Sequence, residues 1–301
     1  MDRLAPERAP LETVLFDGPL VRIGAFRAHP RHPRFHDSGP IENHVFVFPR
    51  TSVWIQHEGR SAFVGDPTVV TFYNRGEVYR REPIAEEGDR CEWFAVTAPV
   101  LLEAVRRFEP EAEDHFERPF PMSHGPSDAQ TYARQRRLAQ ALAGSTRPDP
   151  LRVEETVLEL LDAVLAAAGG IPGRAPPRTP CVLQRRHRDL AEAAKALLAA
   201  AFKENWALGD VADALDVAPG HLCRVFRRQT GTTLHAYRDQ LRLRAALESL
   251  AEPRLDLTQL ALELGYSSHS HFTERFRRAF ATTPSAFRTQ AARSGRAGSI
   301  P

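Results

Sequence analysis

The chain of 301 residues is longer than a usual single hydrophobic core, so we expect two domains. Its composition, 42% hydrophobic and 26% charged, is typical of a globular protein, and no run approaches the roughly eighteen apolar residues of a membrane span. The net charge of +2 is uneven, because residues 181–301 carry 18 Lys and Arg against 12 Asp and Glu. A basic half is a weak indication of polyanion binding, since solvated arginine-rich helices give the same imbalance.

Cysteine usage and the first residues indicate the compartment. Cys91, Cys181 and Cys223 form no C-x-x-C motif and no zinc-finger spacing. The N-terminal residues show no basic segment followed by an apolar one, so we expect no secretory signal. A cytoplasmic location without membrane association is the prediction.

Short segments within residues 41–97 are rich in β-branched and aromatic residues and are separated by Gly, Pro and Asp turns. They are HVFVF, SVWIQ, SAFVG, TVVTFY and CEWFAV. Strands at this spacing predict a small antiparallel barrel or sandwich. Five of the aromatic residues here are candidates for lining a small-molecule pocket, although strand aromatics also serve as plain core. These candidates are Trp54, Phe72, Tyr73, Tyr79 and Trp93.

The segment HPRHPRFH brings His29, His32 and His36 together and suggests a metal site. Pro30 and Pro33 predict an extended loop here, and no H-x-H followed by a suitably spaced Glu and a later strand His is present. We therefore expect no bound metal and no cofactor. No nucleophile is paired with a base in the sequence, so no enzymatic activity is predicted.

From about residue 99 to 168 the pattern becomes helical, in segments 98–108, 129–144 and 151–170. The third segment has a broad apolar face that must be buried. A homodimer interface with the helix at 129–142 would bury it, and packing on the barrel of the same chain would do so equally well. The face contains Leu151, Thr156, Leu158, Leu161, Ala163 and Leu165.

Residues 169–180 contain seven Gly and Pro and predict an interdomain linker. Beyond it the chain contains a repeat, residues 208–231 and 257–281, and each copy has the apolar spacing of a helix-turn-helix motif. The front helices align at an offset of 49 and the back helices at 50, so the second turn is one residue longer. Gly265 is placed where the turn requires a positive φ, and Asp216, a tolerable substitute, occupies the matching place.

The segment LALELGYSSHSHFTERFRRAFATTPSAFR resembles the AraC/XylS family of bacterial transcription regulators. The match lies in the Gly-Tyr turn, the Phe-x-x-x-Phe-Arg-Arg spacing and the Thr-Pro-Ser-x-aromatic-Arg tail, and it covers about residues 187–289. The resemblance implies an α+β multidomain protein. Its parts would be an N-terminal cupin-like antiparallel β-barrel with appended helices at 12–168, the linker at 169–180, and a C-terminal all-α domain with two helix-turn-helix motifs at 181–290.

The resemblance also implies function. It predicts a sequence-specific regulator that binds double-stranded DNA and a small-molecule effector, forms a homodimer, and has RNA polymerase as a candidate partner. The alternative is a cupin-type metal-dependent enzyme fused to a DNA-binding tail. The sequence does not determine the effector, the operator, or whether the protein activates or represses.

Three positions depart from the family pattern. Ala281 replaces the usual Gly after the second back helix, and Ala218 replaces a common Ser N-cap, each at a cost of about 1 kcal/mol. Glu274 replaces a frequent base-contacting Arg. It occupies the place of Arg224 in the first copy, so the two helices are predicted to read different bases.

The two motifs are joined by one predicted helix at 233–250, which spans roughly 27 Å. This spacer would place two recognition helices about one DNA turn apart, roughly 34 Å, in successive major grooves. One chain would then read two adjacent half-sites. The predicted core of the motifs is Leu215, Leu222, Phe226, Leu264, Phe272 and Phe276.

Residues on the outer faces of the back helices are the DNA-binding candidates. Arg224 is predicted to bind guanine in a bidentate manner, while Glu274 either accepts from cytosine or pairs with Arg277 or Arg278 on its own helix. The paired arginines would contact phosphates, and the alternative for each is a solvated surface charge. The candidates are Gly220, His221, Cys223, Arg224, Arg227 and Arg228, and then His269, Ser270, Thr273, Glu274, Arg277 and Arg278.

Overall fold

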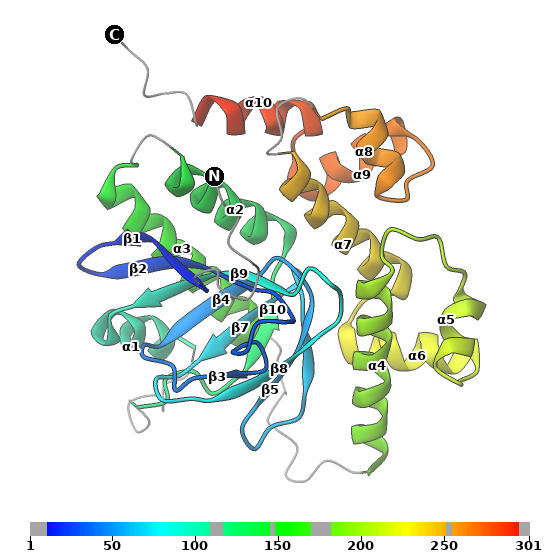
Figure 1. Ribbon diagram of the computed structural model, residues 1–301, viewed down its shortest axis with the longest axis horizontal. Helices are drawn as coiled ribbons and strands as arrows, with labels where there is room; N and C mark the ends of the chain where they lie inside the picture. Colours follow the sequence, from blue (N-terminus) through cyan, green and yellow to red (C-terminus); the bar gives the residue numbers. More distant parts are fainter. Residues whose placement is uncertain (1–10, 109–116, 145–147, 170–181, 251–254, 295–301) are drawn as a thin grey trace. The chain divides into compact units, whose positions relative to one another are not determined.

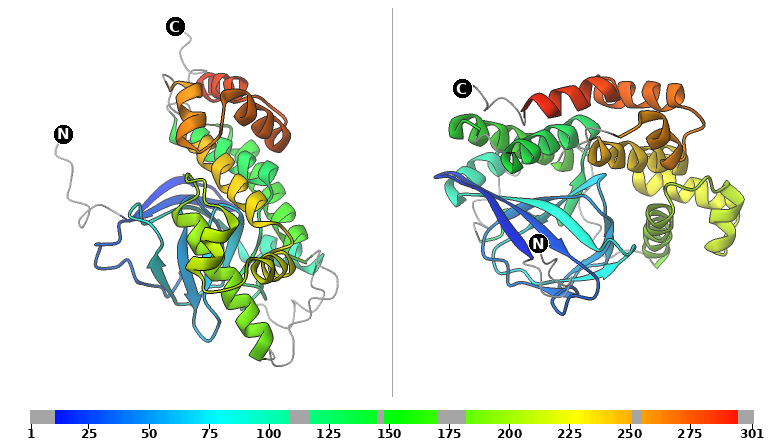
Figure 2. Two further views of the ribbon diagram at one scale, coloured as in Figure 1. Left: turned by 90° about the vertical axis from the view of Figure 1, so that its right-hand side faces the viewer. Right: turned by 45° about the horizontal axis from the view of Figure 1, so that its top comes forward.

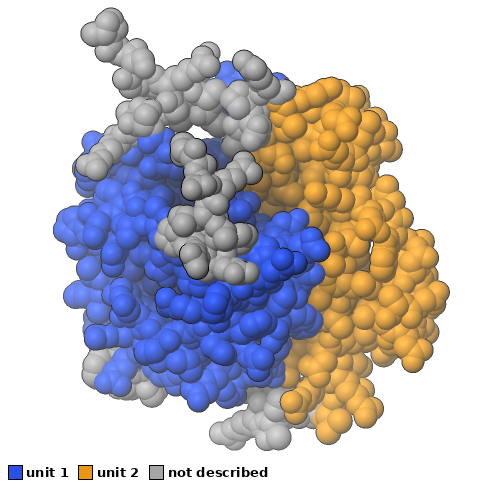
Figure 3. Space-filling model, viewed as in Figure 1, with its two compact units in different colours: residues 1–171, 286–301 blue, residues 172–285 orange. Residues whose placement is uncertain are grey.

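The computed structural model describes residues 11–108, 117–144, 148–169, 182–250 and 255–294 (Figure 1). The chain forms two compact units, residues 1–171 with 286–301, and residues 172–285 (Figure 3). Unit 1 contains antiparallel sheets and helices, and unit 2 is helical, which confirms the α+β class. The predicted linker at 169–180 lies outside the described residues except for Gly169.

Unit 1 contains two antiparallel sheets, a six-stranded one in the order β1-β2-β9-β4-β7-β10 and a four-stranded one in the order β3-β8-β5-β6. The strands are β1 (Glu12–Asp17), β2 (Val21–Ala28), β3 (Asp37–Ser38), β4 (Val45–Pro49), β5 (Val53–His57), β6 (Phe63–Gly65), β7 (Val69–Tyr73), β8 (Tyr79–Pro83), β9 (Asp89–Val96) and β10 (His124–Pro126). The five predicted strands correspond to β4, β5, β6, β7 and β9.

Three of the other five strands, β3, β8 and β10, escaped the sequence patterns for physical reasons. β3 and β10 are too short to show a periodicity, and β8, with sequence YRREP, carries three charged residues. Its Arg81 is nevertheless 1% exposed, because it pairs with Asp89 of β9 at 2.7 Å and donates to the Phe35 carbonyl oxygen at 2.9 Å. A satisfied buried ion pair makes a charged segment compatible with a core strand.

Helices cover one face of the six-stranded sheet (Figure 2). They are α1 (Ala98–Arg106), α2 (Ala129–Ala143) and α3 (Pro150–Gly169). On this face Phe46 lies directly opposite both Phe72 and Phe94, with its ring stacked on that of Phe94 at 5.2 Å. The buried carboxylate of Glu92 points to the same side and accepts from Arg136 of α2 at 2.7 Å.

The apolar face of α3 differs in phase from the predicted one. Leu151 is 66% exposed, which corrects its assignment to the buried face, since it lies in the first turn of the helix. The buried apolar side chains are Val153, Val157, Leu160, Leu161, Val164 and Leu165. Burial in a single chain favours the second alternative, packing within the chain's own unit.

The histidine segment is not the expected extended loop. The His32 amide donates to the His29 carbonyl oxygen at 2.8 Å, and the Phe35 amide donates to the His32 carbonyl oxygen at 2.9 Å, so two turns follow each other. Pro30 and Pro33 occupy the second position of each turn, where the fixed φ of proline is favourable. Phe35, completely buried, anchors the segment.

Unit 2 contains the two predicted motifs and their connecting helix. α5 (Leu208–Ala214) with α6 (Pro219–Thr230) forms the first motif, and α8 (Leu257–Glu263) with α9 (His269–Phe280) forms the second. α4 (Val182–Ala200) precedes them, α7 (Leu234–Ser249) connects them, and α10 (Pro284–Ser294) follows. Within the described residues, no helix is both long and apolar enough to cross a membrane.

Candidate nucleic-acid interface

The first motif has a left-handed turn at the predicted position. Asp216 has φ 53°, and the following Val217 amide donates to the Ala212 carbonyl oxygen at 3.0 Å. α6 buries Leu222, Val225 and Phe226. It begins after Ala218, which offers no side-chain cap, so the orphan amides of the first turn lack the acceptor that Ser would supply.

The second motif repeats this arrangement with different residues. Gly265 takes the left-handed position with φ 80°, and the Ser268 hydroxyl caps α9 by accepting from the His271 amide at 3.2 Å. Both positive-φ predictions are confirmed. α9 ends at Ala281, whose φ of 55° requires the strained left-handed conformation, whereas α6 ends at Gly231 with φ 74°.

The predicted core is confirmed for five of its six members. Leu222, Phe226, Leu264, Phe272 and Phe276 are buried. Leu215 is only half-buried, because it follows the last residue of the short helix α5.

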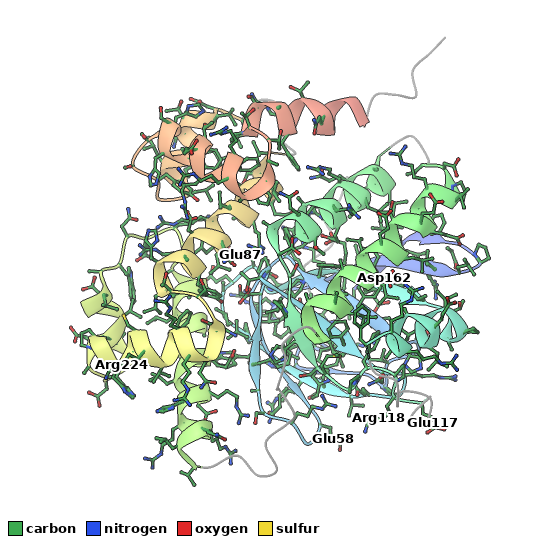
Figure 4. All side chains as sticks on the ribbon, turned by 180° about the vertical axis from the view of Figure 1, so that it is seen from behind. Glu58, Glu87, Glu117, Arg118, Asp162 and Arg224 are labelled. Atoms are coloured by element: carbon green, nitrogen blue, oxygen red, sulfur yellow. The ribbon has the colours of Figure 1, made fainter. Side chains whose placement is uncertain are left out.

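None of the twelve predicted DNA-binding residues is buried, so all of them are free of a core role. Cys223, Arg224, Arg227 and Arg228 are exposed along α6, and the guanidinium of Arg224 lies beside Gly220 at the start of the helix. Figure 4 shows Arg224 on the surface. Across the described parts of the chain, these three arginines make no ion pair with a carboxylate.

Glu274 on α9 differs from its counterpart Arg224 in having charged partners. Its carboxylate accepts from Arg277 Nη2 at 3.1 Å and from Arg278 Nε at 2.8 Å. These hydrogen bonds lower the pKa of Glu274 below its usual value, with the arginine charges adding to the effect. The geometry of the predicted helix-surface pair is therefore present.

Sequence reasoning missed three charged residues behind the recognition helices. Asp239 and Arg242 lie on α7 and are 7% and 6% exposed, and Arg275 on α9 donates to Asp239. Charges in a connecting helix ordinarily point to solvent, so nothing in a single sequence indicated that Asp239 and Arg242 are buried.

In unit 1 the five candidate ligand-binding aromatics do not share one face. Strand residues alternate between faces, so the neighbours Phe72 and Tyr73 of β7 point in opposite directions. Phe72 packs on the helix side, where its ring is 5.0 Å from that of Phe120. Trp54 lies opposite Val64 and Glu82 on β6 and β8, on the side away from Ile55 and its core neighbours.

Tyr73, Tyr79 and Trp93 lie on the inner strand faces, between the two sheets. The ring of His57, on β5, stacks on Tyr73 of the other sheet at 4.8 Å, and Tyr73 lies 4.6 Å from Tyr79. Burial raises the pKa of both tyrosines, for Tyr79 to about 12, so their phenols stay protonated. Trp93 lies across Gly24, whose missing Cβ would clash with the indole at 2.3 Å.

His57 was not a sequence candidate, yet it is a buried polar side chain of this inner layer. Its Nδ1 lies 3.2 Å from Glu77 Oε2, and its Nε2 is buried without a hydrogen-bond partner among the residues described. Burial by itself would raise the pKa of Glu77, but hydrogen bonds from His57 and Asn74 outweigh it and lower the pKa to about 2. The indole Nε1 of Trp93 is likewise buried and unpartnered within the described residues.

Comparison with known proteins identifies the C-terminal region. Residues 211–290 match the helix-turn-helix domain family. The chain is 41% identical over 73 residues to the HTH-type transcriptional regulator GlxA of Rhizobium meliloti, covering 24% of this chain and 22% of the relative. It is 41% identical over 68 residues to the probable transcription factor PqrA of Proteus vulgaris (23% and 56%), and 34% identical over 87 residues to the transcriptional activator RhaS of Pectobacterium carotovorum (29% and 30%).

The chain thus covers less than two thirds of each of these relatives. Among solved structures, an AraC-type regulator from Chromobacterium violaceum matches 36% of this chain and 96% of its own, at 30% identity and a TM-score of 0.34. ToxT of Vibrio cholerae with a bound unsaturated fatty acid matches 91% and 96%, at 9% identity and a TM-score of 0.35, which is too low to carry an inference. The double motif and the sequence matches together identify residues 211–290 as a helix-turn-helix domain similar to that of these transcriptional regulators.

Proposed function

We propose that the protein is a sequence-specific DNA-binding transcriptional regulator whose recognition helices α6 and α9 each enter a major groove. The observation that carries the proposal is the repeated motif, in which each back helix buries one apolar face and leaves its N-terminal polar face and two arginines accessible. The twelve candidate residues of α6 and α9 form the proposed interface. The proposed DNA-binding domain is residues 181–290, joined by a linker at 169–180 to a domain at 12–168.

Duplex binding over a salt series tests this function. Because each phosphate contact releases counterions, the logarithm of affinity should fall by about 0.9 for each contact per tenfold rise in salt. We expect residues 181–301, with their net charge of +6, to show this dependence as the full chain does. Affinity that is unchanged between low and moderate salt would contradict the function.

Unit 1 is the proposed effector-binding part, with its two sheets forming a cupin-like barrel. His57 Nε2 and Trp93 Nε1 support this assignment, because a buried polar atom without a partner costs about 1–3 kcal/mol. We expect the effector to carry a hydrogen-bonding group for His57 Nε2 and an aromatic or apolar body that contacts the neighbouring Tyr73 and Tyr79.

A thermal-shift screen of metabolites against the full chain tests effector binding. A binding molecule should raise the melting temperature of the wild type and have less effect on His57→Phe, which keeps the stacked ring and removes Nε2. Trp54→Phe, on the outer side of β5, is the matched control and should respond as the wild type does.

The alternative of a metal-dependent enzyme has less support, because the curated relatives are transcriptional regulators. Within the described ranges no group of three or more His, Cys, Asp or Glu side chains could hold a metal ion. Metal analysis of the purified protein separates the two functions. Homodimerisation and contact with RNA polymerase stay predictions of the family resemblance, as does a cytoplasmic location, and sedimentation of the full chain tests the dimer.

A further inference from the structure

The connecting helix α7 carries a buried arginine that contacts both the second motif and the segment that precedes the first motif. Arg242 Nε donates to the Phe202 carbonyl oxygen at 2.6 Å, and Nη2 donates to the Glu204 carbonyl oxygen at 2.8 Å and to Asn205 Oδ1 at 3.0 Å. These acceptors lie in the segment that leads from α4 into the first motif. The third nitrogen, Nη1, donates to the carbonyl oxygen of Gly265 at 2.9 Å, in the turn of the second motif.

A planar guanidinium has five N–H donors in a fixed fork, so it can hold acceptors that lie in several directions. Here the fork spans two segments that are more than sixty residues apart in sequence. Burial lowers the pKa of Arg242, with the neighbouring Arg238 charge adding to the effect. Carbonyl oxygens, rather than a carboxylate, accept the hydrogen bonds that stabilise the buried positive charge of Arg242.

The two segments held by Arg242 are in direct contact. A Cβ added at Gly265 would lie 2.2 Å from the Lys203 carbonyl oxygen and 2.6 Å from Arg242 Nη2. Glycine is thus required here by the close approach as well as by its φ of 80°. Asp216, the equivalent residue of the first motif, carries a side chain at this place and is exposed.

A second side chain of α7 holds the recognition helix itself. Asp239, one turn before Arg242, accepts from the Tyr266 hydroxyl at 2.9 Å and from Arg275 Nε and Nη2 at 3.0 and 2.5 Å. Arg275 belongs to α9, and Tyr266 directly follows Gly265. The ring of Tyr266 lies 5.7 Å from the Arg242 guanidinium, so both contacts belong to one network.

We propose that Arg242, supported by Asp239, is a positioning residue that fixes the second recognition helix relative to the first motif, so that the chain reads two half-sites at one spacing only. This role rests on the proposed DNA-binding function and adds to it. α7 alone would hold the motifs through a single packed helix, whereas the network ties the second motif directly to the segment before the first. A rigid pair of helices cannot follow half-sites that are moved apart or rotated.

The test is the dependence of affinity on half-site spacing. The full-length wild type first selects its operator from a random-sequence duplex library, and duplexes are then made with one base pair added or removed between the half-sites. One base pair rotates the second site by roughly 35° about the DNA axis. For the wild type we expect a loss of about tenfold or more with either change, comparable to a mismatched base pair.

Arg242→Lys keeps the charge but cannot hold acceptors in three directions. We expect it to bind the best-spaced duplex more weakly and to lose only about threefold or less when the spacing changes. Arg238→Lys is the matched control on the same helix, because Arg238 donates to the Trp206 carbonyl oxygen at 2.9 Å but makes no hydrogen bond to the second motif within the described residues. It should keep the wild-type dependence on spacing.

Asp239→Asn provides a second variant if Arg242→Lys fails to fold, which far-ultraviolet circular dichroism will show, and it should also weaken the spacing dependence. If a folded variant loses the same factor for every spacing, the network only stabilises the fold and the positioning role is overturned. If the wild type selects no duplex, the proposed DNA-binding function fails and the positioning role fails with it. If the wild type selects a duplex but binds duplexes of every spacing equally well, only the positioning role is overturned.

Discussion

In the first helix-turn-helix motif the left-handed turn is exposed, whereas in the second motif it is packed against the connecting helix α7. Asp216 is exposed in its turn, and Gly231 ends α6 without strain. In the second motif Gly265 is packed against Lys203 and Arg242, and α9 is bound to Asp239 through Arg275. The repeat preserves the helix arrangement while the supporting contacts differ.

The two motifs are therefore alike in their core positions and differ at some of their surface positions. The equivalent core residues Phe226 and Phe276 are both completely buried. The equivalent surface residues Arg224 and Glu274 have opposite charges, and only Glu274 has ion-pair partners among the residues that the structure describes. Variants at matched positions can therefore separate what the two motifs have in common from what is particular to each.

The largest expected effect tests the shared core. Phe226→Ala and Phe276→Ala should each lower the free energy of unfolding of the helical region by about 3–5 kcal/mol, because each removes a fully buried ring and leaves a cavity. Urea unfolding followed by far-ultraviolet circular dichroism measures this. Phe→Leu at each position should cost less than half as much, and a marked inequality between the two sites would show that the cores are not equivalent.

A smaller effect is expected from the recognition residue of the first motif. Arg224→Ala should weaken binding to the selected duplex by about 1–3 kcal/mol, the usual discrimination of a bidentate arginine–guanine contact. The control Arg227→Ala should weaken binding to all duplexes similarly and reduce the salt slope by about one. If Arg224→Ala left the base preference at every position unchanged, Arg224 would be a phosphate contact or a solvated charge.

The matched residue of the second motif should behave differently. If Glu274 accepts from a cytosine, Glu274→Ala should keep or gain overall affinity, since a negative charge near phosphates is lost, and should lose about tenfold preference at one base pair. Selection from a randomised operator measures both quantities. An unchanged base preference would leave the ion pairs with Arg277 and Arg278 as the whole role of Glu274.

The sequence predicted the parts of the fold that depend on local patterns. Apolar periodicity predicted the helices of unit 2, and the alignment of the two copies predicted the positive φ at Asp216. The predicted buried face of α3 differs from the observed one, because Leu151 is apolar and yet exposed. A single helix with apolar residues on several sides does not show which side meets the sheet.

Long-range polar contacts were not predictable. Arg81, Asp239 and Arg242 are buried charges whose partners lie 8 to 47 residues away in sequence. Among the aromatic candidates of unit 1, Phe72 and Tyr73 are neighbours on β7 and must point to opposite faces of the sheet. This difference could be predicted from the sequence. The stacking of His57 on Tyr73 could not, since it requires the two sheets to be placed face to face.

The smallest predicted effect concerns the C-terminal ends of α6 and α9, where the two motifs have Gly231 and Ala281 in the same left-handed conformation. Ala281→Gly should raise the free energy of unfolding by about 0.5–1 kcal/mol. Relief of the left-handed strain of a non-glycine residue, about 1–2 kcal/mol, exceeds the added entropy of glycine in the unfolded chain.

Gly231→Ala is the reciprocal variant and should lower the free energy of unfolding by a similar amount. An added Cβ at Gly231 meets no atom within 4 Å, so its cost arises from backbone conformation and not from a clash. Thermal unfolding of the two variants beside the double variant gives the comparison, and the double variant should return close to the wild-type stability because the sites are independent. A destabilising Ala281→Gly would mean that the Ala281 methyl group makes contacts worth more than the strain, and the two helix ends would then not be equivalent.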